Sequence, residues 1–121
     1  MSDYEFSMPF PPSVNMYFTH SRHHGRKILG KRGRAYKNDC MEALESLGLC
    51  GEGITERVSV VIHMRPPTIA KRDLDNYLKA PLDALSDAEF WDDDSQIDSL
   101  KIVRKEKVKG GRLDVFVDRL T

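Results

Sequence analysis

The segment from Val58 to Met64 constrains the fold most, because it is a continuous run rich in β-branched residues. Such a run is suited to a central strand of a sheet. Pro66 and Pro67 follow directly and stop it. With 121 residues in all, the chain has room for one hydrophobic core. We therefore expect a single domain, residues 1–121, built around this strand.

Apolar periodicity predicts the elements that surround the central strand. Some segments alternate between apolar and polar residues, as strands do, and others repeat their apolar positions at helical spacing. The order β-α-β-α-β-β predicts an α+β fold of two layers, with two main helices packed on a mixed four-stranded sheet. The predicted strands are residues 4–8, 58–64, 97–105 and 112–118, and the predicted helices are residues 34–47 and 74–85.

Proline and glycine refine these boundaries. Pro81 falls inside the second predicted helix, where it removes one backbone hydrogen bond and is expected to introduce a kink. Gly48 is placed to end the first helix. Lys109-Gly110-Gly111 predicts a tight turn into the last strand. Residues 19–33 lack apolar periodicity and are predicted to form a basic, flexible loop.

The formal net charge of zero conceals a segregation of opposite charges. A basic segment can neutralise DNA phosphates, whereas an acidic segment repels them unless a cation lies between. Together the two segments suggest a phosphate-backbone ligand and a bridging metal ion. The basic segment contains Arg22, Arg26, Lys27, Lys31, Arg32, Arg34 and Lys37, and the acidic segment contains Asp83, Asp87, Glu89, Asp92, Asp93, Asp94 and Asp98.

DNA binding is the function that we expect of the basic segment, with a solvated loop as the alternative. Histidine and tyrosine side chains in the same segment are suited to phosphate and base contacts. The predicted set of cationic DNA contacts is Arg22, Arg26, Lys27, Lys31, Arg32, Arg34, Lys71 and Arg72, and the accompanying side chains are Tyr17, His20, His23 and His24.

The sequence Arg72-Asp73-Leu74-Asp75-Asn76 is the first candidate for chemistry. Asp73 and Asp75 are two residues apart before a helix, so both carboxylates can point the same way. Lys79 lies one helical turn beyond Asp75. Paired carboxylates suit Mg²⁺, which accepts few protein ligands and keeps several waters. In the alternative interpretation, Asp73 only caps the helix and Asp75 and Lys79 form an ordinary surface ion pair.

The sequence Phe90-Trp91-Asp92-Asp93-Asp94 is the second candidate. Adjacent aspartates repel one another, so they require solvent or a cation; a plain surface loop is the alternative. The two aromatic residues are expected to anchor this segment on the core and so to fix where the carboxylates point. The glycine and final glutamate of an EF-hand are missing, and neither a phosphate-binding glycine loop nor a serine-nucleophile motif occurs.

The cysteines and the distribution of apolar residues indicate the compartment in which we expect the protein. Cys40 and Cys50 do not form a CxxC pair, and we expect two reduced thiols. A zinc site that combines them with His23 and His24 lacks the usual ligand spacing. No apolar run approaches the ~20 residues needed to span a bilayer, and the N-terminus lacks the features of a signal peptide. We expect a cytoplasmic protein without membrane contact.

These motifs, taken in order, resemble those of the RusA family of Holliday junction resolvases. The resemblance covers most of the chain and is strongest around Asp73, Asp75 and Lys79. The segments that carry it are Pro11-Pro12-Ser13-Val14-Asn15, Arg72-Asp73-Leu74-Asp75-Asn76, Asp83-Ala84-Leu85, Phe90-Trp91-Asp92-Asp93-Asp94-Ser95-Gln96 and Lys109-Gly110-Gly111-Arg112-Leu113.

The resemblance implies a homodimeric endonuclease that depends on Mg²⁺, with Mn²⁺ able to substitute. It implies symmetric, paired nicks in four-way DNA junctions during recombination and repair. By matching motif, Asp73, Asp75 and Asp94 correspond to catalytic, metal-binding aspartates and Lys79 to a catalytic lysine, with Asn76 and Asp93 in supporting positions. A nuclease for flaps or other branched DNA and a non-catalytic DNA-binding regulator remain as alternatives.

Overall fold

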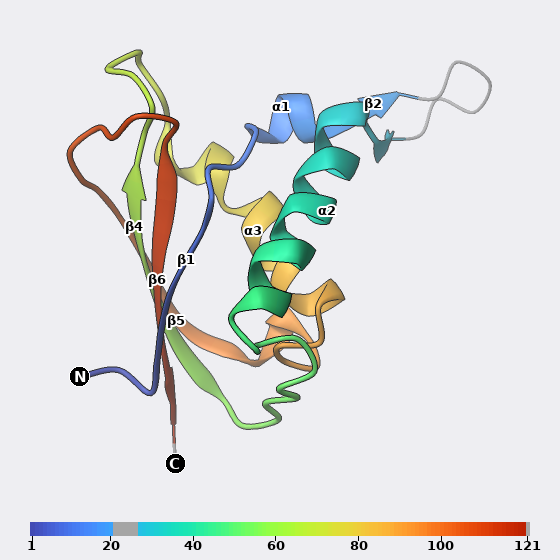
Figure 1. The fold of residues 1–121 in the computed structure, drawn as a ribbon, viewed down its shortest axis with the longest axis vertical. Coiled ribbons are helices and arrows are strands. Elements are labelled where there is room, and N and C mark those ends of the chain that lie inside the picture. Colours follow the sequence, from blue (N-terminus) through green and yellow to red (C-terminus); the bar gives the residue numbers. More distant parts are fainter. Residues whose placement is uncertain (21–26, 121) are drawn as a thin grey trace.

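The computed structural model describes residues 1–20 and 27–120. Figure 1 shows a twisted sheet with α2 and α3 packed on one of its faces. This arrangement confirms the predicted α+β class and its mixed four-stranded sheet. The elements are β1 (Tyr4–Pro9), α1 (Val14–Tyr17), β2 (Phe18–His20), β3 (Lys27–Leu29), α2 (Lys31–Ser46), β4 (Val58–Arg65), η1 (Leu74–Tyr77), α3 (Lys79–Asp87), η2 (Asp94–Gln96), β5 (Ile97–Arg104) and β6 (Arg112–Arg119).

The strand predicted to be central, β4, lies inside the sheet, whose order is β1-β6-β4-β5. It pairs parallel with β5 and antiparallel with β6. The predicted turn at Gly110–Gly111 leads into β6, but it does not join neighbouring strands, because β4 lies between β5 and β6. Because β5 runs parallel to β4, the chain must pass the carboxyl end of β4 before β6 can begin. The amide of Val108 donates to Pro66 O on this crossing.

One hydrophobic core fills the space between the sheet and the helices. Alternate residues of β4 and β6 are buried toward α2 and α3, which fits the two-residue period of a strand. Trp91 and Phe90 are almost completely buried in the same core, as the sequence predicted. The strand residues that contribute are Val58, Val60, Ile62, Met64, Leu113, Val115 and Val117.

The second predicted helix is divided in the structure. The 3₁₀ turn η1 ends at Tyr77, and α3 begins at Lys79. Pro81 therefore lies in the first turn of α3, where its missing N–H has no intrahelical partner to lose. The prediction of one continuous helix with a kink at Pro81 is therefore wrong. In a continuous helix the ring of Pro81 would clash with the carbonyl of Tyr77, four residues earlier. This clash explains why the helix is broken between Tyr77 and Lys79.

The predicted loop of residues 19–33 is wrong for the part that the structure describes. Strands β2 and β3 form an antiparallel ribbon, and α2 begins at Lys31 rather than Arg34. Strands of three residues are too short to show apolar alternation, so the sequence did not reveal them. Residues 21–26, with Arg22, His23, His24 and Arg26, lie outside the described part of the chain.

Both cysteines are free thiols, as expected. Cys40 is buried, and this burial raises its pKa to about 12. Within residues 1–20 and 27–120, no helix combines the length and the hydropathy that a bilayer crossing requires.

Candidate functional site

Asp73 and Asp75 lie where the loop that follows β4 enters η1, and both side chains are exposed. Asp73 has extended backbone geometry at the cap position but makes no side-chain cap hydrogen bond. Lys79 forms its ion pair with Asp83, not with Asp75. Neither of the two alternative roles, helix cap or surface pair with Lys79, is therefore observed. Both carboxylates remain without a hydrogen-bond or ion-pair partner among the described residues.

Arg72 fixes the loop that presents these carboxylates. Its guanidinium donates to Thr68 O at 2.9 Å, Ala70 O at 3.1 Å and Thr68 Oγ1 at 3.0 Å. The same group lies over the ring of Phe10, 5.5 Å from the centroid. Arg104 at the end of β5 donates to Arg72 O. Arg72 thus clamps its own loop, and a DNA contact from this residue stays a prediction.

Gly111 packs closely against Pro67 of the same loop and against Phe10, and this close packing gives a testable prediction for stability. Its φ of +69° is in the left-handed region, and an added Cβ would lie 2.8 Å from Pro67 Cδ and 2.9 Å from Phe10 Cγ. Gly111→Ala should lower the free energy of unfolding by about 2–4 kcal/mol, from backbone strain and overpacking together. Urea denaturation measures this change.

Gly110→Ala is the matched control for that substitution. Gly110 has a similar φ of +79°, but no atom lies within 4 Å of its added Cβ. Only the backbone term of roughly 1–2 kcal/mol applies there. Equal losses in the two variants would contradict the packing of Gly111 against Phe10 and Pro67.

Lys79, the first residue of α3, has a half-exposed side chain that is held by Asp83 and, through it, by Tyr17. Its ammonium lies 3.0 Å from Asp83 Oδ1, and Tyr17 Oη donates to Asp83 Oδ2 at 3.0 Å. Tyr17 has no exposed surface, so the predicted contact of this tyrosine with DNA is wrong. No sequence pattern indicates this network, because 66 residues separate Tyr17 from Asp83.

The second acidic motif forms a compact turn before β5. The Asp93 carboxylate accepts from Ser95 N at 3.0 Å, and Gln96 Oε1 accepts from Asp93 N at 3.0 Å. Hydrogen bonds from Ser95 lower the pKa of Asp93 below its usual range. Asp93 therefore caps η2, whereas the adjacent Asp94 is partly exposed and its carboxylate has no partner among the described residues.

Trp91 anchors this turn on the hydrophobic core. Its indole Nε1 donates to Ser86 Oγ at 2.8 Å, and its backbone forms a bridge with Ile54. Gln96 adds bonds to Ile54 O at 2.9 Å and Glu56 O at 2.7 Å. The position of Asp94 is thus fixed by the core, as predicted for the aromatic pair.

The two acidic elements lie beyond opposite ends of β5. Arg104, its last residue, contacts Arg72 beside Asp73, whereas Asp94 begins the turn that leads into the first residue of β5. An eight-residue strand is about 25 Å long. Within the described part of the chain, no group of three or more His, Cys, Asp or Glu residues could hold a metal ion. The structure of one chain therefore does not bring Asp94 to Asp73 and Asp75.

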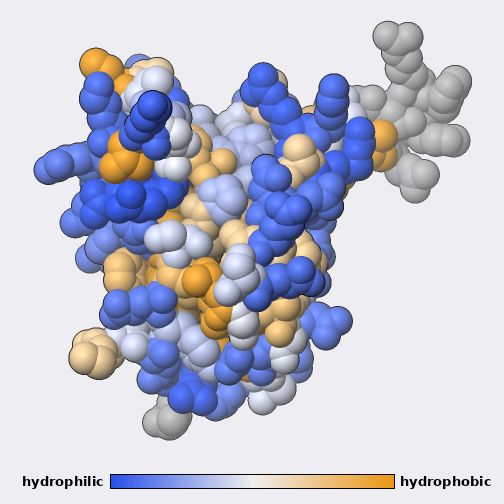
Figure 2. All heavy atoms as spheres, viewed as in Figure 1, coloured by the Kyte–Doolittle hydropathy of each residue, from blue (hydrophilic) through white to orange (hydrophobic). Residues whose placement is uncertain are grey.

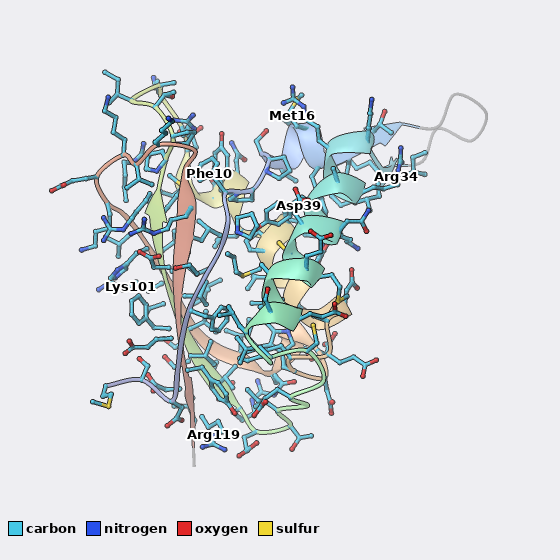
Figure 3. The ribbon with its side chains drawn as sticks, in the orientation of Figure 1. Phe10, Met16, Arg34, Asp39, Lys101 and Arg119 are labelled. Atoms are coloured by element: carbon cyan, nitrogen blue, oxygen red, sulfur yellow. The ribbon has the colours of Figure 1, made fainter. Side chains whose placement is uncertain are left out.

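Cationic side chains gather around the start of α2. Lys31 and Arg32 are exposed in its first turn and line an open groove of about 360 Å³ with Phe18. Arg34 lies at this end of α2, and Lys101 lies on the opposite side of the molecule (Figure 3). The Arg34 guanidinium donates to Leu29 O at 2.8 Å. Figure 2 shows hydrophilic side chains covering this end of α2.

The other cations of the basic segment and of the predicted DNA contacts differ in exposure and in their interactions with the protein. Lys27 lies over the ring of Phe18 at 5.9 Å from the centroid, and Lys71 is exposed on the loop that Arg72 clamps. The remaining cation of the basic segment, Lys37, pairs with Asp87 at 2.6 Å. Lys31, Arg32 and Lys71 are thus exposed and make no ion pair with a described residue.

The donor set of the first motif fits a divalent cation such as Mg²⁺. Carboxylate oxygens are hard ligands, and Mg²⁺ needs only one or two of them because it retains water. Asp73 and Asp75 supply two exposed carboxylates that no cation of the described protein neutralises. Asn76, one of the two supporting residues, is partly buried in η1, and its backbone N–H donates to Asp73 O at 3.1 Å.

Comparison with known proteins agrees with these motifs. The Crossover junction endodeoxyribonuclease RusA of Escherichia coli (strain K12) is 34% identical over 120 residues, covering 99% of this chain and 98% of that protein. Proteins of the same name in Shigella sonnei (strain Ss046) and Enterobacteria phage 82 match with the same identity and coverage. The family model described as Endodeoxyribonuclease RusA matches residues 9–118. The chain therefore belongs to the RusA endodeoxyribonuclease family.

Proposed function

We propose that this protein is a structure-specific endonuclease that resolves four-way DNA junctions by paired, symmetric nicks, with Mg²⁺ as its cofactor. The observation that carries the proposal is the pair of exposed carboxylates, Asp73 and Asp75, on a loop clamped by Arg72. Leaving two carboxylates unpaired beside a DNA-binding surface is unfavourable unless a cation joins them to phosphate. Family membership supports the same reaction.

Each group in the proposed site has a separate task. Asp73, Asp75 and Asp94 hold the divalent ion, which, when bound, supplies Lewis-acid activation of the hydrolytic reaction. Lys79 places a positive charge near the scissile phosphate, where negative charge develops. Lys31, Arg32 and Lys71 position the DNA backbone without reading bases. Exposed ammonium and guanidinium groups are suited to this task, because contacts to phosphate require positive charge and do not depend on the base sequence.

We propose further that the complete acidic set forms only in a homodimer. In one chain, Asp94 and the pair Asp73–Asp75 lie beyond opposite ends of β5. A two-fold axis can place Asp94 of one chain beside Asp73 and Asp75 of the other, which forms two equivalent sites. Two equivalent sites match the two equivalent strands of a junction, and they account for paired nicks.

Mixing two inactive variants tests this arrangement. Homodimers of Asp75→Asn and of Asp94→Asn should both be inactive. A heterodimer of the two carries both substitutions in one shared site and leaves the other site intact, so nicking of one strand should return. Sites built within one chain would leave every site of the heterodimer damaged, and mixing would restore nothing.

A substrate panel tests the proposed function itself. Four-way junction, flap, fork and linear duplex of equal length should be incubated with and without Mg²⁺, with Mn²⁺ in parallel. We expect symmetric cleavage of the junction only when a divalent ion is added. Preference for the flap would favour the branched-DNA nuclease instead. Junction binding without cleavage in either metal would favour a non-catalytic DNA-binding regulator.

A further inference from the structure

The network around Lys79 has a feature that an ordinary surface ion pair lacks. The Asp83 carboxylate contacts two groups at once, with Oδ1 at 3.0 Å from Lys79 Nζ and Oδ2 at 3.0 Å from Tyr17 Oη. Exposed i,i+4 pairs contribute little order, because both side chains stay mobile. Here one partner is restrained, since Tyr17 is completely buried and its hydroxyl donates to that carboxylate.

The hydroxyl of Tyr17 is well suited to this restraint. Burial, and then the Asp83 carboxylate, raise the pKa of Tyr17 well above its ordinary value, so the group stays a neutral donor at any working pH. The tyrosine backbone is fixed as well. Gly30 N donates to Tyr17 O at 2.8 Å, and an added Cβ on Gly33 would lie only 2.5 Å from that oxygen.

We infer that Tyr17 and Asp83 are positioning residues that hold the ammonium of Lys79 in place for the cleavage step. This inference rests on the proposed function of Lys79. It also links two parts of the protein, because Tyr17 ends α1 and its carbonyl contacts Gly30, the residue before α2. The surface proposed to bind DNA and the lysine proposed to act on the phosphate are therefore joined through one side chain.

Preorganisation is the physical effect that this network supplies. A lysine side chain has many rotamers, and an ammonium that is not held would occupy its working position only part of the time. Asp83, when restrained by Tyr17, narrows that distribution. Loss of the tyrosine hydroxyl should therefore slow the chemical step and leave DNA affinity unchanged, because Tyr17 has no surface with which to contact DNA.

The test compares two tyrosine variants that each lose one buried hydroxyl. Tyr17→Phe removes the donor to Asp83, whereas Tyr36→Phe removes a donor to Pro9 O at 2.8 Å and serves as the matched control. Single-turnover cleavage of a four-way junction should slow on the order of tenfold in Tyr17→Phe. The junction Kd of that variant should stay unchanged, and the Tyr36→Phe rate should equal that of the wild type.

A lysine variant separates positioning from a general structural effect. In the Lys79→Ala background, Tyr17→Phe should reduce the residual rate no further, because the group that it positions is gone. An additional decrease there, an equal loss in Tyr36→Phe, or an unchanged rate in Tyr17→Phe alone would overturn the inference.

A second readout does not depend on cleavage. The ¹⁵N NMR signal of the Lys79 ammonium, assigned by its absence in Lys79→Ala, should show slow proton exchange in the wild type and fast exchange in Tyr17→Phe. Identical exchange in the two proteins would overturn the inference even if the wild type resolves junctions. Absence of junction cleavage by the wild type would instead remove the proposed function, while a Tyr17-dependent NMR signal would still establish the network.

Discussion

Asp75→Asn should abolish junction cleavage while leaving junction binding intact. The substitution removes one of two exposed carboxylates that fit Mg²⁺ and changes the side-chain volume very little. Loss of several kcal/mol of metal-derived stabilisation corresponds to a rate lower by roughly 10³-fold or more. Gel-shift titration gives the binding, and single-turnover cleavage in saturating Mg²⁺ gives the rate. Binding should even tighten slightly, because a negative charge near DNA is removed.

Asp39→Asn is the matched control for that experiment. Asp39 is exposed on α2 and carries the same carboxylate, and the substitution changes the net charge by the same amount (Figure 3). Its cleavage rate should equal the wild-type rate. Mg²⁺-dependent cleavage by Asp75→Asn at more than a few per cent of the wild-type rate would remove Asp75 from the proposed metal site.

Junction affinity should decrease steeply as salt increases. Cations that neutralise phosphates release condensed counterions, and a protein with several such contacts loses about 10³–10⁵-fold in affinity between 50 and 200 mM salt. Lys31 and Arg32 are two exposed cations of the first turn of α2, whereas the third, Arg34, donates to Leu29 O. Replacing both by alanine should reduce the slope of log K against log salt by about 2.

Lys101→Ala controls for a general change in charge. Lys101 is exposed on β5, on the side of the molecule opposite Arg34 (Figure 3). Its removal should leave the salt slope unchanged. A slope that is flat in the wild type, or equally reduced by Lys101→Ala, would contradict DNA binding at the start of α2.

The sequence predicted the parts of the fold that depend on apolar periodicity. β1, β5 and β6 appear where alternation placed them, and β4 appears where the β-branched run placed it. Burial of one face against the helices gives β1, β4 and β6 a two-residue period. The ribbon β2–β3 and α1 were missed, since elements of three or four residues carry too few apolar positions to show a period. The sequence also did not indicate which strands are neighbours: β4 lies between β5 and β6.

The sequence also predicted which side chains could act but not how they are held. Spacing was sufficient to single out Asp73, Asp75 and the run Asp92-Asp93-Asp94, because carboxylates near one another are conspicuous in any chain. The choice of Asp94 within that run came from the resemblance to the RusA family. Long-range contacts carry no such signal. Tyr17 was interpreted as a DNA contact and proved to be a buried donor to Asp83, and Arg72 proved to clamp its own loop.

The parallel pairing of β4 with β5 has a consequence for how such an enzyme would be controlled in a cell. Parallel strands of a sheet start at the same edge, so the acidic turn before β5 is kept remote from the loop after β4 in every folded molecule. If the site needs two chains, as proposed, a monomer has no complete metal site and does not cleave DNA. Cutting then increases with the square of the protein's abundance while monomers predominate, and dilution alone switches it off.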